Sequence, residues 1–129
     1  MRWIIALCFT TFLMAEELNW HKHAYSMALQ DAKISGKPMM IMFSAKHCRA
    51  CIWMKESVIA RPDINEYLAK NYVLAMIDID KDPIPKNFEV VGTPMFYFQD
   101  AKEKFLHKRL IGGKKPDYFL KLLKKITKK

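Results

Sequence analysis

Residues 38–44 form an apolar run without alternation, and this run leads directly into a Cys-x-x-Cys motif, Cys48 and Cys51. Such a run is typical of a strand that is covered on both faces, as in the centre of an α/β sheet. Apolar residues at helical spacing follow from Cys48 to about Ile59, until Pro62 interrupts the pattern. The positions that fit a helix buried on one side are Cys51, Ile52, Met54, Val58 and Ile59. The sequence therefore predicts a buried strand followed by a helix that begins at the cysteine pair.

That placement favours redox chemistry at the two cysteines. At the N-terminus of a helix, unpaired backbone N–H groups and the helix dipole stabilise a thiolate, the form of cysteine that attacks disulfides. Lys46, His47 and Arg49 flank Cys48 and add to this stabilisation when they are charged. Because a very stable thiolate favours an oxidising role, these residues leave the direction of electron flow open.

The first fifteen residues are typical of an export signal, with Arg2 at the start and an almost wholly apolar stretch over residues 3–14. This stretch is short for a bilayer span. We therefore expect residues 1–15, including Cys8, to be removed as a signal peptide, and residues 16–129 to form one domain. An uncleaved membrane anchor is the alternative.

The rest of the chain alternates between helical and extended patterns. A strand, a crossover helix and another strand predict a parallel pair, and a late hairpin adds antiparallel strands. The further expected elements are a helix from Trp20 to Ser35 capped by Asn19 and ended by Gly36, a short helix capped by Asp63 with Glu66 in a capping box, strands over residues 72–79, 95–99 and 104–111, and a final helix over residues 117–126.

The net charge of +9 comes from basic residues spread along the chain. Since no nucleic-acid motif accompanies them, we expect a solvated basic surface and no nucleic-acid partner. Asp78, Asp80 and Asp82 alternate as in a calcium loop, but the glycine and distal glutamate of such a loop are missing, so we expect solvated acids. Zinc takes four ligands, of which Cys48 and Cys51 supply half. A metal site and a redox-inert binding module stay open as alternatives.

Three segments give the chain a resemblance to the thioredoxin superfamily. They are Cys48-Arg49-Ala50-Cys51 after an apolar strand, a second apolar strand ending at residues 77–80, and Val91-Gly92-Thr93-Pro94 before a hairpin and a terminal helix. The chain is also similar to exported thioredoxin-like proteins and to the C-terminal periplasmic domain of the bacterial transmembrane disulfide reductase. The residues that carry this second resemblance are Trp20 with Ala28 and Ala32, Gly36-Lys37-Pro38 before the strand, and Met54-Lys55 after the cysteines. This resemblance implies an α/β, thioredoxin-like fold over residues 16–129: a central mixed sheet flanked by helices, with an extra N-terminal helix.

The same resemblance implies a periplasmic thiol–disulfide oxidoreductase that reduces disulfides of exported proteins, such as apocytochrome c. Cys48 would be the exposed nucleophile and Cys51 the buried resolving thiol. Pro94 would be a cis-proline facing the disulfide, and Thr93 would offer its backbone to an extended substrate segment, with His47 at the site entrance. A dithiol oxidase or isomerase of the same fold is the alternative.

We further expect no cofactor, no metal and a monomer, with protein disulfides as substrates and a membrane thiol-reductant conveyor as electron donor. The chain also departs from cytosolic thioredoxins near the site. His47 replaces a tryptophan, Arg49 and Ala50 replace a Gly-Pro pair, and Met42 replaces a buried aspartate. These departures, together with the signal, argue against a cytosolic thioredoxin role. A protein anchored in the membrane and facing the periplasm is the alternative for its location.

Overall fold

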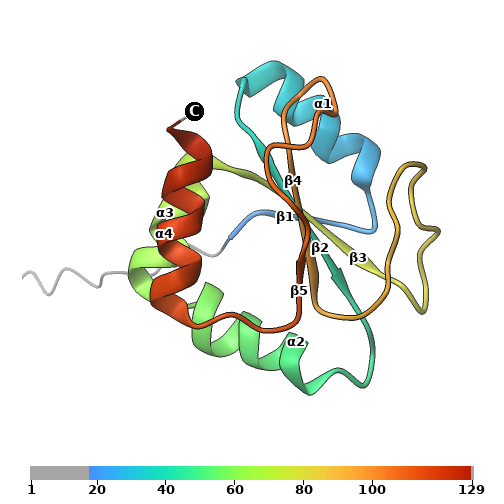
Figure 1. The fold of residues 1–129 in the computed structure, drawn as a ribbon. Helices are drawn as coiled ribbons and strands as arrows, with labels where there is room; N and C mark the ends of the chain where they lie inside the picture. Colours follow the sequence, from blue (N-terminus) through green and yellow to red (C-terminus); the bar gives the residue numbers. More distant parts are fainter. Residues whose placement is uncertain (1–17, 129) are drawn as a thin grey trace, which may run out of the picture.

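The computed structural model describes residues 18–128, and the statements below concern this part of the chain. Its strands form one five-stranded sheet in the order β1-β3-β2-β4-β5 (Figure 1). β1 and β2 pair with β3 in parallel, and β4 pairs antiparallel with both β2 and β5. The mixed sheet that the sequence predicts is confirmed. The strands are β1 Trp20–Lys22, β2 Met39–Ser44, β3 Val73–Asp78, β4 Met95–Gln99 and β5 Leu110–Ile111.

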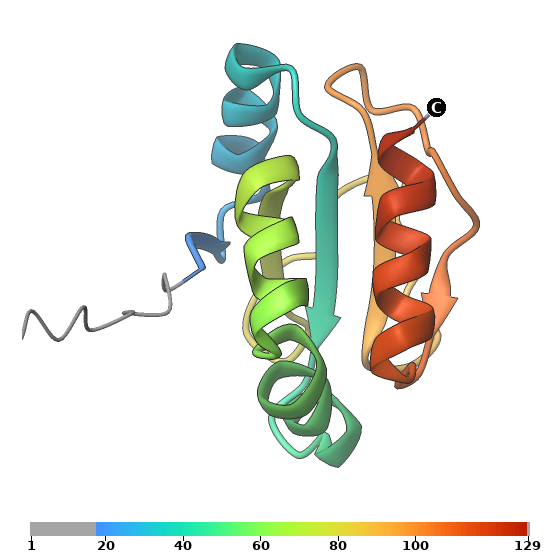
Figure 2. The same cartoon turned by 90° about the vertical axis from the view of Figure 1, so that its left-hand side faces the viewer.

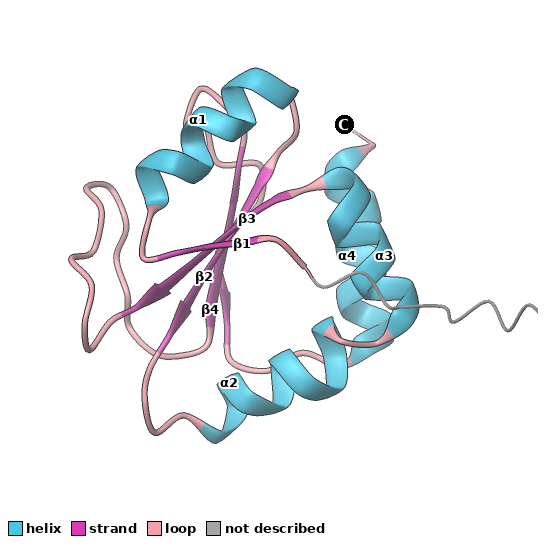
Figure 3. Cartoon of the chain, turned by 180° about the vertical axis from the view of Figure 1, so that it is seen from behind, coloured by secondary structure: helices cyan, strands magenta, loops and turns pink. Residues whose placement is uncertain are grey.

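Helices cover both faces of this sheet (Figures 2 and 3). α1 packs on one face, while α2, its π-helical continuation η1, α3 and α4 pack on the other. The bounds are α1 Tyr25–Ser35, α2 Arg49–Trp53, η1 Met54–Ile59, α3 Pro62–Asn71 and α4 Pro116–Thr127. The central strands and the final helix lie within one residue of their predicted ends, which supports the thioredoxin-like fold expected from the resemblance.

β2 lies at the centre of the sheet, and its side chains alternate between two cores. Met40 and Met42 belong to the core under α2, α3 and α4, whereas Met39, Ile41 and Phe43 belong to the core under α1. All five side chains are fully buried. Burial of one such side chain contributes about 1.5–3 kcal/mol. The strand that precedes the cysteine motif is therefore fixed by packing on both faces, as predicted.

The N-terminal helix begins later than the sequence predicts. The segment expected as its first turn is strand β1, which pairs with residues 74–76 of β3, and α1 begins at Tyr25. Trp20 packs against the core under α2, α3 and α4, so the strand is held by burial as well as by pairing. Asn19 consequently caps no helix. Gly36 does end α1, in the left-handed conformation with φ 73°, as expected.

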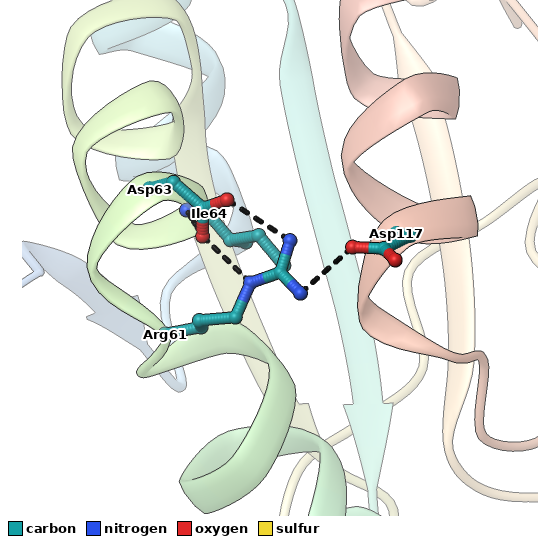
Figure 4. Close-up of polar contacts among 4 residues, drawn as sticks. All are labelled: Arg61, Asp63, Ile64 and Asp117. Carbon is teal, nitrogen blue, oxygen red and sulfur yellow. Dashed lines mark hydrogen bonds and ion pairs between the residues drawn. The ribbon is translucent and has the colours of Figure 1, made fainter.

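The capping box predicted at Asp63 and Glu66 is not formed. Asp63 instead accepts two hydrogen bonds from the guanidinium of Arg61, at 2.7 and 2.9 Å. Glu66 pairs with Lys70 at 2.8 Å. Arg61 also donates to Asp117 at the start of α4, at 2.9 Å (Figure 4). The first turn of α3 is thus tied to α4 through an arginine that local sequence rules do not identify.

The hairpin that follows the central sheet is antiparallel, as predicted, but its second strand is short. In place of a strand over residues 104–111, β5 has two residues, and a single isolated bridge joins Gln99 to Phe105. The turn between them is closed by Asp100, whose carboxylate accepts two backbone N–H groups of the same turn at 2.9 and 3.0 Å. Pairing is found at the bridge beside this turn and again at β5, opposite Met95 and Phe96.

Candidate functional site

The two cysteines occupy different positions at the start of α2. Cys48 is the N-cap residue, and the backbone N–H of Cys51 donates to its Sγ at 3.1 Å. Cys51 lies inside the helix with 1% of its surface exposed, whereas Cys48 is only partly buried. A disulfide joins the two sulfurs, and the Cα atoms are 5.2 Å apart. Because the outer sulfur already accepts a helical N–H, it is placed to carry negative charge after reduction.

The Thr93–Pro94 peptide bond is cis, as predicted. It lies at the same end of the sheet as the cysteine pair, because β2 and β4 run antiparallel with Phe43 opposite Met95. The loop that leaves β2 and the residue that enters β4 therefore meet at one sheet end. The carbonyl of Pro94 accepts the N–H of Gly112 at 2.8 Å, which joins this turn to the residue after β5.

The basic residues that flank Cys48 all lie on the surface. Lys46, His47 and Arg49 are exposed. Salt and water screen exposed charges more strongly than buried ones. We therefore expect their effect on the Cys48 thiolate to be smaller than that of the helix N-terminus beneath it.

Asp80 is exposed, as the sequence predicts for all three acids, whereas Asp78 and Asp82 are partly buried. Each of the three carboxylates accepts a backbone hydrogen bond. Asp78 accepts from the N–H of Asp80 at 2.9 Å, and Asp80 accepts from the N–H of Lys46 at 2.8 Å. Asp82 accepts from the N–H of Asp78 at 2.8 Å. Asp82 also pairs with His23. Burial alone would raise the pKa of Asp82, but these bonds hold that pKa below its ordinary value. The acids connect the end of β3 to the loop that precedes the cysteine motif.

A cavity of ≈ 290 Å³ borders Cys51. Nζ of Lys55 donates to Oγ of Ser44 at 3.3 Å, so an ammonium group is fixed in the cavity wall. No role at the site was predicted for Lys55, although the four-residue spacing from Cys51 to Lys55 places both on one side of a helix. The lining residues come from β1, β2, β3, α2, η1 and the adjoining loops: Lys22, His23, Ser44, Ala45, Lys46, Cys51, Ile52, Lys55, Met76 and Asp78.

Apolar side chains are exposed on α2, β5 and the loop before Pro94. Ile52 is 50% exposed, although the helical pattern predicts it on the buried side, and Trp53 is 41% exposed. A Cβ at Gly113 would lie 3.2 Å from the Trp53 ring. The chain that follows β5 therefore packs directly against the helix that carries the cysteines, and the absence of a side chain at Gly113 permits this approach.

The family model of the thioredoxin-like domain matches residues 25–127, which is most of the chain. The chain belongs to this family. The Cys48–Cys51 disulfide lies within the matched residues.

A similar curated protein is protein disulfide-isomerase A3 of Gallus gallus, which is 32% identical over 91 residues. The match covers 69% of this chain and 17% of that protein, so this chain corresponds to a small part of a much longer one.

Solved structures share the fold over most of the chain. A thioredoxin from Thermus thermophilus is 28% identical with a TM-score of 0.71, covering 84% of this chain and 86% of its own. DsbH oxidoreductase reaches a TM-score of 0.72 at 23% identity, covering 95% and 92%. The oxidised C-terminal domain of DsbD from Neisseria meningitidis reaches 0.65 at 19% identity, covering 77% and 89%. The last two likenesses show the fold alone.

Residues 18–128 offer neither a candidate membrane span nor a candidate metal site. In this part of the chain, no helix combines the length and the apolar character that a membrane span requires. Nor does the same part hold a group of three or more His, Cys, Asp or Glu side chains arranged to bind a metal ion. The export signal predicted over residues 1–15 lies outside the described residues.

Proposed function

We propose that the protein is a periplasmic protein-disulfide reductase that acts on exported proteins through Cys48 and Cys51. The observation that carries this proposal is the pairing of a partly exposed sulfur at a helix N-terminus with a buried sulfur three residues later. A protein substrate can reach the outer sulfur. The inner sulfur is accessible to its neighbour in the motif, so it is suited to resolving a mixed disulfide.

The reaction is a pair of thiol–disulfide exchanges. The Cys48 thiolate attacks one sulfur of a substrate disulfide, and the other substrate sulfur leaves with the electron pair of the broken bond. Deprotonated Cys51 then attacks Sγ of Cys48, which forms the Cys48–Cys51 disulfide and breaks the bond to the substrate. The substrate departs with both sulfurs reduced. Two electrons from a thiol donor must then return the protein to its dithiol form.

The proposed substrate-binding residues are Thr93, Pro94 and His47. The cis bond before Pro94 lies at the sheet end that carries the cysteines, where the Thr93 backbone can pair with an extended substrate segment. His47 is exposed in the loop before Cys48, at the entrance to the site. The exposed apolar surface on α2 and β5 suits an unfolded or extended segment of an exported protein.

The direction of electron flow depends on how strongly the site stabilises the Cys48 thiolate. Strong stabilisation favours an oxidant, but the flanking cations at Lys46, His47 and Arg49 are exposed and therefore screened. Moderate stabilisation of the Cys48 thiolate favours a reductase.

The proposed setting is the periplasm, which the signal-like first fifteen residues support. There the protein would work as a monomer on protein disulfides, with a membrane thiol-reductant conveyor as its electron donor and without nucleic acid, metal or cofactor. Fractionation of cells that make the full chain tests this setting. The proposal requires a shortened or anchored form with its cysteines accessible from the periplasm, and full-length protein confined to the cytosol would contradict it.

The experiment that tests the function is a measurement of the reduction potential of the Cys48–Cys51 couple in defined thiol buffers. Cys8→Ser in the full chain removes the third thiol. A value near that of thioredoxin, about −270 mV, supports a reductase, whereas a value near about −120 mV indicates a protein that forms disulfides. If the two cysteines form no titratable couple, both the reductase and the oxidase role are refuted. A redox-inert binding module is then the better interpretation.

A further inference from the structure

The resolving thiol, Cys51, is surrounded by apolar side chains of the hydrophobic core, which do not stabilise a thiolate. Cys51 is 1% exposed and belongs to the core under α2, α3 and α4. Met42 of β2 and Met76 of β3, which are in register with each other, belong to or pack against the same core. Burial of a thiol in apolar surroundings favours its neutral form. If Cys51 resolves a mixed disulfide, its thiolate needs stabilisation from another direction.

A cation, the ammonium group of Lys55, lies on the wall of the cavity that borders Cys51. Lys55 follows Cys51 by four residues, and both line the cavity. Nζ of Lys55 donates to Oγ of Ser44 at 3.3 Å, and Ser44 is 5% exposed. A hydrogen bond to a buried hydroxyl restricts the long lysine side chain, which would otherwise extend into solvent. The ammonium is therefore held on the cavity wall that it shares with the resolving thiol.

The other charged or titratable groups of the cavity wall come from β1, β3 and two loops. They are Lys22, His23, Lys46 and Asp78. Asp78 is the one acid among them, and its Oδ1 accepts the N–H of Asp80 at 2.9 Å, which ties that oxygen to the turn after β3. His23 is paired with Asp82, which itself does not line the cavity. Cations thus outnumber anions on this wall, and Lys55 is the cation on the same helix as Cys51.

We propose that the Lys55 ammonium stabilises the Cys51 thiolate across this cavity and thereby speeds the second exchange step. This inference rests on the proposed thiol–disulfide exchange. The Cys51 thiol loses its proton to solvent, and the thiolate attacks Sγ of Cys48 in the mixed disulfide. The Cys48–Cys51 bond forms, the bond from Cys48 to the substrate sulfur breaks, and that sulfur leaves with the electron pair. Lys55 exchanges no proton or electron and acts through its charge.

The test separates the two exchange steps in time. Reduced full-length protein carrying Cys8→Ser is mixed in a stopped-flow instrument with a chromogenic aromatic disulfide. Attack by Cys48 releases a first equivalent of coloured thiol, and attack by Cys51 releases a second. A Cys51→Ser variant identifies the first phase, because it can release only the first equivalent. Both rates are measured as a function of pH.

The informative variant is Lys55→Gln, which keeps a hydrogen-bond donor for Ser44 but removes the charge. We expect the second phase to slow about tenfold near neutral pH and its pH profile to move upward by about one unit, as for loss of a neighbouring opposite charge. The first phase should change less than about twofold by the same reasoning, since Cys48 is stabilised mainly by the helix N-terminus. Lys55→Arg should restore the second phase. Lys33→Gln, on exposed α1 surface, is the matched control.

Failure of this inference can be told apart from failure of the proposed function. If the unmodified site gives both phases but Lys55→Gln leaves the second phase and its pH profile unchanged, the exchange stands and the role of Lys55 is refuted. Slowing that Lys55→Arg does not restore would also refute a charge effect. If the unmodified site gives no second phase, the exchange mechanism itself fails.

Discussion

At Cys48 the backbone leaves an extended loop and enters α2, so its sulfur lies where the first helical N–H groups are unpaired. Cys51, one turn later, is enclosed by the core. Two identical side chains three residues apart thus have different access to solvent and substrate. The chemical asymmetry of the site comes from the position of each residue in one helix.

This asymmetry predicts the behaviour of Cys51→Ser. Cys48 can still form a mixed disulfide with a substrate, but the variant lacks the thiol that releases it. We expect reducible adducts with exported proteins to accumulate in periplasmic extracts. Turnover should fall at least about a hundredfold, because the two cysteines act as one catalytic unit and the loss of either stops the reaction. Non-reducing electrophoresis and mass spectrometry identify the adducts. Cys48→Ser is the control and should trap none; equal trapping by both variants would contradict the assigned roles.

The sequence predicted the two cysteines from their motif at the start of a helix, and the resemblance to the thioredoxin superfamily implied the cis-proline. It did not predict the cavity or the position of Lys55. The hydrogen bond from Lys55 to Ser44 joins residues eleven positions apart, on a helix and a strand. Whether such a lysine turns toward the strand or toward solvent depends on the space left by β1 and β3, which no local pattern specifies.

At the scale of elements, α2 depends on the chain that follows β5 for part of its packing. Gly113 lies against the ring of Trp53, and an added Cβ would approach Cζ3 to 3.2 Å and Cε3 to 3.3 Å. Contacts this close require the ring to move. Because Trp53 is 41% exposed, it has room to move outward at moderate cost.

Gly113→Ala is therefore expected to destabilise the protein by about 1 kcal/mol, at the low end of overpacking effects. The emission spectrum of Trp53 should shift as its ring moves, and the free energy of unfolding follows from urea titration. Combining Gly113→Ala with Trp53→Ala removes the clash, so the glycine substitution should then cost close to nothing. An unchanged cost in the double variant would show that backbone freedom, not the ring, requires glycine here.

Arg61 ties α3 to α4 through Asp63 and Asp117, and this contact responds to acid. The hydrogen bonds from Arg61 are the main cause that lowers the pKa of Asp63. Since the folded state has the lower pKa, the unfolded chain binds more protons in acid. The contribution of Asp63 to stability is present above the unfolded pKa and is lost as pH falls through the folded one.

Arg61→Gln should consequently flatten the dependence of stability on pH in the acid range. Urea midpoints measured between about pH 6 and pH 3 should fall less steeply in the variant than in the parent protein. Because all three side chains are near the surface, the difference should shrink at high salt. Lys37→Gln, in the loop between α1 and β2, controls for the change in net charge. A parallel loss at every pH would refute the linkage to Asp63.

The predicted elements were most accurate where apolar patterns repeat, as in β2, β3 and α4. β1 was predicted as part of a helix because three residues, Trp20 to Lys22, carry no period of their own. Their conformation is set by pairing with residues 74–76, more than fifty positions along the chain. The capping box failed for a similar reason, because Arg61 captured Asp63 and linked it to a residue on α4.

At the scale of the whole molecule, two helical layers pack on a sheet whose centre is buried on both faces. Phe98 of β4 is fully buried in the core under α2, α3 and α4, and its ring lies 6.1 Å from that of Tyr72. Phe105, by contrast, is 43% exposed beside Phe88 and Tyr97. Phe98 therefore belongs to the core between the sheet and the helices, whereas Phe105 lies largely at the surface.

Phe98→Ala should lower the free energy of unfolding by about 3–5 kcal/mol, since it removes transfer energy and leaves a cavity in a closed core. Phe105→Ala should cost clearly less, because its ring is already partly in water. Chemical denaturation followed by circular dichroism measures both. Equal losses for the two variants would mean that the layers do not share one cooperative core.

The position of β1 has a consequence for shortened versions of this chain. β1 is the outermost strand on its side of the sheet and covers the edge of β3. A version that starts after Lys22 would expose the N–H and C=O groups of β3, and such an open edge is a template for pairing between chains. It would also remove the Lys22 side of the cavity beside Cys51. Aggregation of such a version would therefore follow from its uncovered edge, not from a fault in the redox site.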